Sequence, residues 1–260
     1  MGEAAGLHYD IHGPDGAPTL ILSSGLGGAG AYWTANLAAL AAEYRVVTYD
    51  QRGTGASAAA PAGETSVADM AQDVVALMDA LGIDRAHFIG HALGGMIGIE
   101  AALLSGRIDR LVVVNGWRTL SPHTARCFDA RLAILRGAGV EPFLRAQPLF
   151  LYPPDWIAAH DADLEAALAH HLASFPGVDT MEKRIAAVRA WSPSPDRLSA
   201  LRSVLVVATR DDVLVPYSAA LDLAEGFPAA DVATFAWGGH ACNVTDPHGF
   251  NRLVLGFLGS

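Results

Sequence analysis

The sequence predicts an α/β protein with a mainly parallel sheet, helices on both faces of that sheet, and an inserted helical cap. Short apolar, β-rich runs alternate with stretches of helical periodicity, which is typical of parallel strands buried on both faces. One long stretch, 117–195, has helical periodicity and no strand pattern. The predicted strands, in chain order, are GLHYDIH (6–12), TLILS (19–23), RVVTYD (45–50), AHFIG (86–90), RLVVVN (110–115), SVLVVAT (203–209) and DVATFAW (231–237).

Local signals place the first helices and one edge of the sheet. Helices are expected at about 31–43, 66–81 and 94–105, and Gly82 ends the second of them. The first run, GLHYDIH, alternates polar and apolar residues and is followed by the turn-forming HGPDGAP. We therefore expect it to form an antiparallel hairpin with TLILS at the edge of the sheet.

The stretch 117–195 is too long for a single crossover and too periodic for a loop. We expect it to be a helical cap inserted between two strands, while 1–116 and 196–260 form the core domain. Open α/β sheets bind ligands at the carboxyl ends of their strands, and caps of this kind cover such sites.

Length and charge narrow the class of function. The chain has 260 residues, enough for one large α/β domain, and its formal net charge is −10, which opposes binding to nucleic acid or anionic membranes. No apolar run reaches the ~20 residues of a spanning helix, and MGEAAGLHYD lacks the basic and apolar regions of a secretory signal. We expect a cytoplasmic protein whose partner is a small-molecule substrate; a homodimer stays possible.

The two cysteines, Cys127 and Cys242, are too few for a disulfide framework and are not spaced as metal ligands. No metal and no cofactor are therefore expected.

The stretch AHFIGHALGGMIGI (86–99) joins an apolar run to a helix-like segment through a glycine-flanked turn. Turns of this shape present a nucleophilic serine in many hydrolases, and their strain requires small residues two positions before and after the presented side chain. Gly90 and Gly94 meet that requirement around Ala92. The nucleophile position therefore carries only a methyl group.

Two later loops supply a candidate acid and a candidate base. In VLVVATRDDVLVP, Asp212 follows a strand by a short turn and is a better partner for a histidine than Asp211. Asn115, at the other strand end that can supply the acid, is not a carboxylate, which also favours Asp212. His240 lies on a glycine-rich loop after the last predicted strand. The order elbow, acid, histidine is that of a Ser-His-Asp triad on a parallel sheet.

The segment SSGLGGAGAYW follows the strand TLILS directly. In this architecture the backbone N–H of Leu26 pairs with that of Leu93 to form an oxyanion hole. These donors do not depend on side-chain identity, so they persist without a serine. Ser24, two residues before Leu26, can add a hydroxyl to this site, and a solvated or turn-capping role for it is an equal alternative.

A dinucleotide site is the competing interpretation of the same segment. GLGGAG fits G-x-G-x-x-G between a strand and a helix, and Asp50 ends the next strand. Tyr32 and Trp33 crowd the start of that helix, however, and the chain has no Tyr-x-x-x-Lys pair. The cofactor interpretation is therefore disfavoured.

These motifs, SSGLGG, YDQRGTGAS, GHALGG, DDVLVP and the late GGH, make the chain resemble the α/β-hydrolase superfamily over its whole length. The resemblance implies an eight-stranded, mainly parallel sheet with an inserted helical cap. More narrowly, GHALG and GGHACNVTDP resemble a hydrolase-like branch that serves pyrimidine catabolism, in which uracil is degraded for nitrogen. That branch implies hydrolysis of carbamate to ammonia and carbon dioxide, or of 3-aminoacrylate to malonic semialdehyde and ammonia.

An alanine cannot form an acyl-enzyme, so the covalent route is closed at Ala92. We expect His240, oriented by Asp212, to move a proton to or from a water or the leaving nitrogen. Two alternatives stay open: a non-catalytic protein that binds a small metabolite, and a serine esterase whose nucleophile was changed to alanine.

Several further side chains are expected to line the substrate pocket. Arg126 suits a substrate carboxylate through a bidentate contact if it points inward. His170 and His171 lie on one helix-like face and are expected to be solvated. The full set of candidate pocket residues is Ser24, His91, Trp117, His123, Arg126, Gln147, Phe150 and Tyr152.

Overall fold

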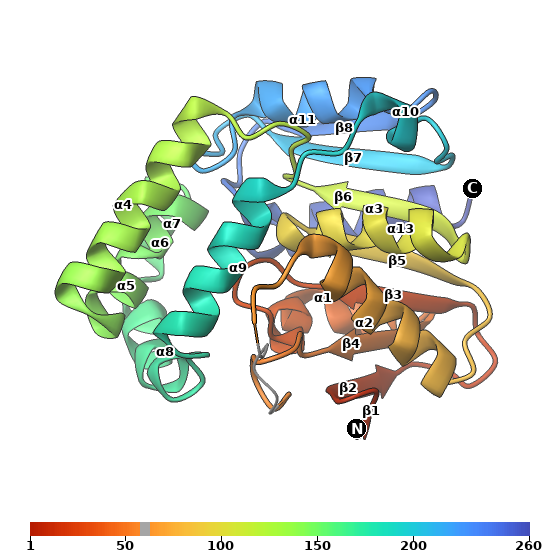
Figure 1. The fold of residues 1–260 in the computed structure, drawn as a ribbon, viewed down its shortest axis with the longest axis horizontal. Helices are drawn as coiled ribbons and strands as arrows, with labels where there is room; N and C mark the ends of the chain where they lie inside the picture. Colours follow the sequence, from red (N-terminus) through yellow and green to blue (C-terminus); the bar gives the residue numbers. More distant parts are fainter. Residues whose placement is uncertain (58–62) are drawn as a thin grey trace.

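Eight strands form one sheet, in the order β1-β2-β4-β3-β5-β6-β7-β8, in the computed structural model, which describes residues 1–57 and 63–260 (Figure 1). Strands β3 to β8 pair with one another in parallel, whereas β2 pairs antiparallel with both β1 and β4. The predicted eight-stranded α/β-hydrolase fold is confirmed. The strands are β1 (Gly2–Ala4), β2 (Leu7–His12), β3 (Thr19–Ser23), β4 (Arg45–Tyr49), β5 (Ala86–His91), β6 (Ile108–Val114), β7 (Val204–Thr209) and β8 (Asp231–Phe235).

The predicted hairpin between the first run and TLILS is wrong. Strand β2 pairs with β1 and with β4, and β4 lies between β2 and β3. Ala5 and Gly6 join β1 to β2 with φ values of 53° and 75°. Two consecutive positive φ values match the twist of a tight hairpin, so this short turn fixes the edge of the sheet.

Helices cover both faces of the sheet. Apolar residues of α2, α3 and α11 pack on one face, and those of α1 and α13 pack on the other. Phe88 and Ile89, adjacent in β5, enter opposite clusters because strand side chains alternate. The core helices are η1 (Gly30–Trp33), α1 (Thr34–Leu40), α2 (Val67–Ala80), α3 (Leu93–Ser105), α11 (Tyr217–Glu225), α12 (Cys242–Thr245) and α13 (Pro247–Leu258).

A group of helices connects β6 to β7. Figure 1 shows α4 to α8 together beyond one end of the sheet, with α9 between them and the core. This group corresponds to the segment that the sequence analysis expects to be the cap, and we refer to it as the cap. Its helices are α4 (Pro122–Ala138), α5 (Val140–Ala146), α6 (Pro148–Leu151), α7 (Pro154–Ala159), α8 (Asp161–Ala173) and α9 (Val178–Ala190), and α10 (Pro195–Leu198) leads back to β7.

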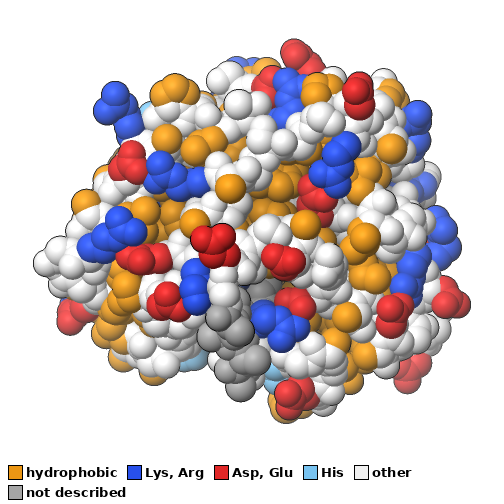
Figure 2. Space-filling view, in the orientation of Figure 1, with side chains coloured by type: hydrophobic (Ala, Val, Ile, Leu, Met, Phe, Trp, Pro, Cys, Tyr) orange, Lys and Arg blue, Asp and Glu red, His pale blue; other side chains and the backbone are white. Residues whose placement is uncertain are grey.

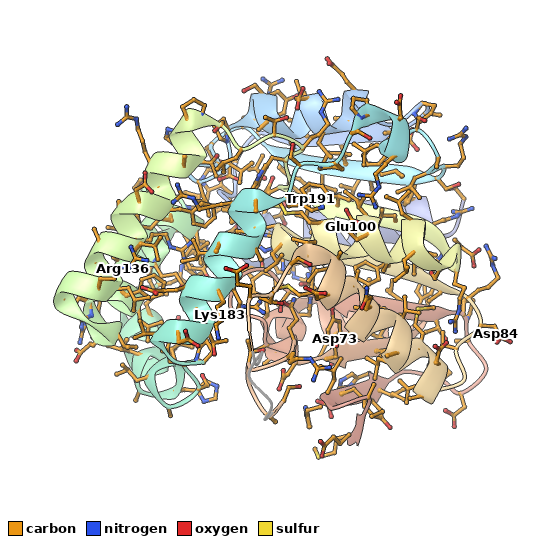
Figure 3. The ribbon with its side chains drawn as sticks, in the orientation of Figure 1. Asp73, Asp84, Glu100, Arg136, Lys183 and Trp191 are labelled. Carbon is orange, nitrogen blue, oxygen red and sulfur yellow. The ribbon has the colours of Figure 1, made fainter. Side chains whose placement is uncertain are left out.

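The far end of α9 is fixed to the core by a buried acid. Trp191 Nε1 donates to Glu100 Oε1 at 2.9 Å, and Arg197 Nη2 donates to Glu100 Oε2 at 2.7 Å. Figure 3 shows Trp191 directed toward Glu100 on α3. A buried carboxylate is stable only with such partners, so this contact holds the cap to the sheet.

The surface carries charges of both signs. On the face drawn in Figure 2, acidic and basic side chains are interspersed over the core and the cap. In the part of the chain that the structure describes, no helix combines the length and the hydropathy needed to cross a bilayer.

Strand β5 and helix α3 are joined by the single residue Ala92. A Cβ at Gly94 would lie 2.1 Å from the backbone oxygen of Ser23, and a Cβ at Gly90 would lie 2.2 Å from the oxygen of Gly94. Both distances are far below van der Waals contact and involve backbone atoms that cannot move away. Only glycine fits at these two positions.

This close packing predicts that Gly94→Ala lowers the free energy of unfolding by about 3 kcal/mol or more, as overpacking against backbone does. Gly137→Ala in α4 is the matched control, because no atom lies within 4 Å of its Cβ site. There alanine is expected to add ~0.5–1 kcal/mol through its helix propensity. Urea denaturation measures both; equal midpoints for Gly94→Ala and the wild type would contradict the steric argument.

Candidate active site

Ala92 occupies the strained turn at which the sheet presents a side chain. Its φ and ψ are 48° and −111°, a conformation that costs free energy for any residue with a Cβ. Its N–H donates to the Val114 oxygen at 2.8 Å, and its own oxygen accepts from the N–H groups of Gly95 and Met96. The backbone therefore holds the geometry of a nucleophile elbow, with a methyl group facing the cavity.

His240 and Asp212 form a buried pair. His240 Nδ1 lies 2.7 Å from Asp212 Oδ2, with 3% and 0% of the two side chains exposed. The other carboxylate oxygen accepts from the N–H groups of Leu214 and Val215, both at 2.8 Å. Because the carboxylate is an acceptor, Nδ1 carries the proton and Nε2 is left as the basic atom.

The neighbouring Asp211 does not pair with His240 but holds the loop that carries it. Its carboxylate accepts from the N–H groups of Gly238 and Gly239 and so shapes the loop that carries His240. The backbone oxygen of His240 is held by Asn115 Nδ2 at 2.8 Å. Asn115 itself has a φ of 49°, at the end of β6. It therefore positions the histidine from the strand end at which other hydrolases can carry the acid.

The predicted oxyanion hole consists of two main-chain amides, those of Leu26 and Leu93, and both residues line the cavity described below. Leu93 is the first residue of α3, and the first N–H groups of a helix have no acceptor within it. The loop after β3 is held from the cap by Arg184, which donates to the oxygens of Gly25 and Leu26 and to Gln51 Oε1. In a trans peptide, the Leu26 N–H is directed opposite to the Gly25 oxygen. Arg184 and the Leu26 N–H therefore lie on opposite sides of the Gly25–Leu26 peptide.

His91 braces the back of the site in its neutral form. Its Nε2 lies 2.8 Å from the His240 oxygen, to which it donates, and its ring stacks on Tyr32 with 4.9 Å between centroids. Burial, with a smaller contribution from the charge of His240, lowers the pKa of His91 to about 3. Its Nδ1 is consequently an acceptor, and it has no partner among the described residues.

These groups surround a cavity of about 380 Å³ between the core and the cap. Of the residues predicted for the pocket, Ser24, His91, Trp117 and Gln147 line it, together with Leu26, Ala92, Leu93 and His240. His170 and His171 are exposed, as expected, and also lie at its wall. Within 1–57 and 63–260, no three His, Cys, Asp or Glu side chains gather as a metal site.

Four predicted pocket residues lie elsewhere. His123 is exposed and contacts the Val213 oxygen at 2.6 Å, and Arg126 is exposed. Phe150 lies against Arg131, and Tyr152 packs on Trp156 with 4.3 Å between ring centroids. None of the four is among the residues that line the cavity.

The helical phase of α4 explains why Arg126 is displaced. The buried residues of this helix are Thr124, Phe128, Arg131 and Leu135, which recur at spacings of three and four. This face is directed inward, and Arg126 lies on another face. Arg131 was missed, although its spacing from Phe128 and Leu135 was visible in the sequence. Arg184 and Asn115 were also missed as positioning residues, and no local signal marked them.

The structure disfavours the dinucleotide interpretation further. The carboxylate of Asp50 accepts from the N–H groups of Gly30 and Ala56, both at 2.8 Å. It therefore braces two loops, and these bonds compete with binding to a ribose hydroxyl.

Known proteins share this fold and this length. A family model described as alpha/beta hydrolase fold matches residues 18–247. The chain is 47% identical to the "Putative carbamate hydrolase RutD" of Caulobacter sp. (strain K31), over 99% of this chain and 97% of that protein. It is 46% identical to the protein of the same name from Agrobacterium fabrum, over 97% and 98%. The crystal structure of a hydrolase from Pseudomonas aeruginosa PA01 matches with a TM-score of 0.86 and 32% identity, over 98% and 94% of the two chains.

The neutral state of His91 predicts an acid-sensitive fold. Its pKa of about 3 lies below the ordinary value of 6.5, so between these values the unfolded chain binds a proton that the folded chain does not. This contribution to stability is present above pH 6.5 and is lost as the pH falls. It amounts to about 2–3 kcal/mol between pH 7 and pH 4.5, at ~1.4 kcal/mol per pKa unit.

The measurement is urea unfolding across that pH range. His91→Gln, whose amide can still donate to the His240 oxygen, is expected to lose this part of the pH dependence. His248→Gln, at an exposed position, is the control and is expected to keep it. Parallel pH profiles for His91→Gln and the wild type would show that His91 is not the group responsible.

Proposed function

The chain belongs to the α/β-hydrolase family, and from that premise we propose that it is a hydrolase of uracil catabolism that splits a C–N bond without a covalent intermediate. The observation that carries the proposal is the intact, buried pair of His240 and Asp212 beside an elbow that presents only the methyl group of Ala92. The name of the relatives supports carbamate as the substrate. The second candidate is 3-aminoacrylate.

Water takes the place of the serine. For carbamate, the water oxygen forms a bond to the carbon while a proton passes to His240 Nε2. The electron pair of the C=O bond moves onto oxygen, where the N–H groups of Leu26 and Leu93 stabilise the charge. The C–N bond then breaks as His240 returns the proton to nitrogen. Ammonia and bicarbonate, the hydrated form of carbon dioxide, leave.

The same groups suit 3-aminoacrylate. A proton first shifts from nitrogen to C2, so that the enamine becomes an imine at C3. The water oxygen then forms a bond to C3 while a proton passes through His240 to nitrogen. The remaining hydroxyl proton passes through His240 to nitrogen as the C–N bond breaks and the C=O bond forms, and malonic semialdehyde and ammonia result. In either case Asp212 keeps the imidazole in the required tautomer and stabilises its charged form.

The oxyanion hole and substrate binding alone are expected to give a modest acceleration, to which His240 adds. Serine hydrolases without their triad retain a rate enhancement of about 10³–10⁴ from the oxyanion hole and binding, equivalent to about 4–5.5 kcal/mol. This is too little for a peptide bond, but both proposed substrates already decompose in water. A fragile substrate therefore fits a site with no nucleophile.

The missing nucleophile also favours a second candidate, a protein that binds a small metabolite without turnover. The site argues against this candidate, however, because a binding protein has no need for a buried His–Asp pair held by two backbone N–H groups. Ammonia release separates the two functions directly.

We predict that the wild type releases ammonia from freshly dissolved ammonium carbamate, or from 3-aminoacrylate generated in the assay, faster than buffer alone. His240→Ala is expected to lose about 10²–10⁴-fold of the catalysed rate, the range typical of general acid–base catalysis. His248→Ala, on the surface, serves as the matched control. Equal rates for the wild type and His240→Ala with both substrates would remove the proposal.

A restored serine tests whether the surrounding site is competent. Ala92→Ser is expected to hydrolyse p-nitrophenyl acetate at least ~10-fold faster than the wild type, because the elbow would present the new hydroxyl toward His240. The double variant Ala92→Ser, His240→Ala is expected to lose that gain. An ester hydrolysis rate that does not change on adding the serine would contradict this reconstruction of the site.

A further inference from the structure

We propose that the guanidinium of Arg131 binds the carboxylate of an anionic substrate inside the cavity, and that the substrate is a short acid whose reacting bond is separated from that carboxylate. Arg131 lies on α4 of the cap, is 4% exposed and lines the cavity. Its Nε is buried and has no hydrogen-bond partner among the described residues. The proposal rests on the proposed function only in identifying the bound acid as the substrate. Of the two candidate substrates it favours 3-aminoacrylate, whose C–N bond at C3 is separated from the carboxylate, over carbamate.

Among the described residues, no carboxylate lies close enough to pair with the positive charge of Arg131. Within the described ranges, no carboxylate forms an ion pair with Arg131, and no Asp or Glu lines the cavity. Arg136, on the same helix, pairs with Glu182 at the surface. An anion in the cavity would supply the partner that Arg131 lacks.

The other buried arginine shows what a structural role requires. Arg184 places its donors on the oxygens of Gly25, Leu26 and Gln51. No hydrogen bond joins Arg131 to such an acceptor in the part of the chain that the structure describes, yet Arg131 is buried to a similar extent. Burial lowers the pKa of Arg131 to about 10, which leaves the side chain charged at neutral pH. Burying an unpaired charge costs free energy, and a bound anion would offset that cost.

Three aromatic rings lie close to the guanidinium of Arg131. The rings of Phe128, Phe143 and Phe150 lie with their centroids 5.9, 5.3 and 5.6 Å from its central carbon. Cation–π contacts act on the charge through the ring faces, whereas the N–H donors lie in the guanidinium plane. A planar carboxylate can accept two of these donors side by side.

Other unpartnered polar atoms belong to the same cavity. Ser24 Oγ, His91 Nδ1 and Trp117 Nε1 are buried without a hydrogen-bond partner in the described parts of the chain, and all three residues line the cavity. Buried polar groups are almost always paired, so a cluster of exceptions around one cavity points to a polar ligand. Arg131 supplies the only full positive charge among the lining residues that the structure describes.

The size of the cavity sets the class of acid. Its volume of about 380 Å³ falls within the ~300–1,000 Å³ of sites that hold drug-sized ligands. That exceeds what a molecule of four heavy atoms fills. Arg131 contributes from the cap, while Ala92 and His240 contribute from the core. The proposed ligand is a short carboxylate that extends from Arg131 toward Ala92 and His240. Its apolar segment would contact the side chains of Leu144 and Phe175, which also line the cavity.

Crotonate and crotonamide test the proposal, because they share size and shape and differ in charge. By isothermal titration calorimetry, the wild type is expected to bind crotonate at least ~10-fold more tightly than crotonamide. Arg131→Met is expected to abolish that preference, Arg131→Lys to keep part of it, and Arg126→Met, on the exposed face of the same helix, to keep it fully. A wild type without the preference, or Arg131→Met with it, would overturn the proposal.

Thermal unfolding separates binding from a structural role. Arg131→Met places an apolar side chain among three phenylalanine rings and removes an unpaired charge, so its melting temperature is expected to equal or exceed that of the wild type. A clear fall would assign Arg131 to packing instead. Arg131→Gln gives the same binding comparison if the methionine variant does not fold. If the wild type prefers crotonate over crotonamide but releases no ammonia, the proposed function is contradicted and the proposal for Arg131 stands.

Discussion

The steric closeness of β5 and α3 is the constraint on which the site depends. Glycines at 90 and 94 allow backbone to pass against backbone, and Ala92 accepts a strained conformation between them. This turn directs the Ala92 methyl group into the cavity and places the Leu93 N–H at the start of a buried helix. The elbow thus keeps its form in the absence of the group that it presents in serine hydrolases.

Burying a charged side chain costs free energy, and four buried basic side chains differ in how this cost is met. His240 is paired with Asp212, Arg184 is surrounded by carbonyl oxygens, and His91 avoids charge by remaining neutral. Arg131 has aromatic rings close to its guanidinium and an Nε with no acceptor among the described residues. The first three are explained by the protein alone, and the fourth is explained by a ligand. The environment of each side chain therefore separates residues that position other protein groups from the residue proposed to bind the ligand.

The cap and the core contribute different parts of the chemistry. In the proposed mechanism the core supplies the histidine, the acid and the amide donors, all at the carboxyl ends of parallel strands, where such sheets place their ligands. The cap closes the cavity, and through Arg184 it also fixes the loop that carries Leu26. Cap and core are also joined at Glu100 and Trp191, so the loop that carries Leu26 and the cap are parts of one packed unit.

The sequence by itself determined the strand runs, the elbow, and the order of Ala92, Asp212 and His240 along the chain, because alternation, glycine spacing and turn residues act between near neighbours. Only the tertiary structure decided that β2 pairs with β1 and β4, and that Arg131 rather than Arg126 meets the cavity. Local periodicity gives a helix an apolar face, but what that face covers depends on how distant segments pack. Arg184 and Asn115 act across long sequence separations for the same reason, since their partners are brought near only by folding.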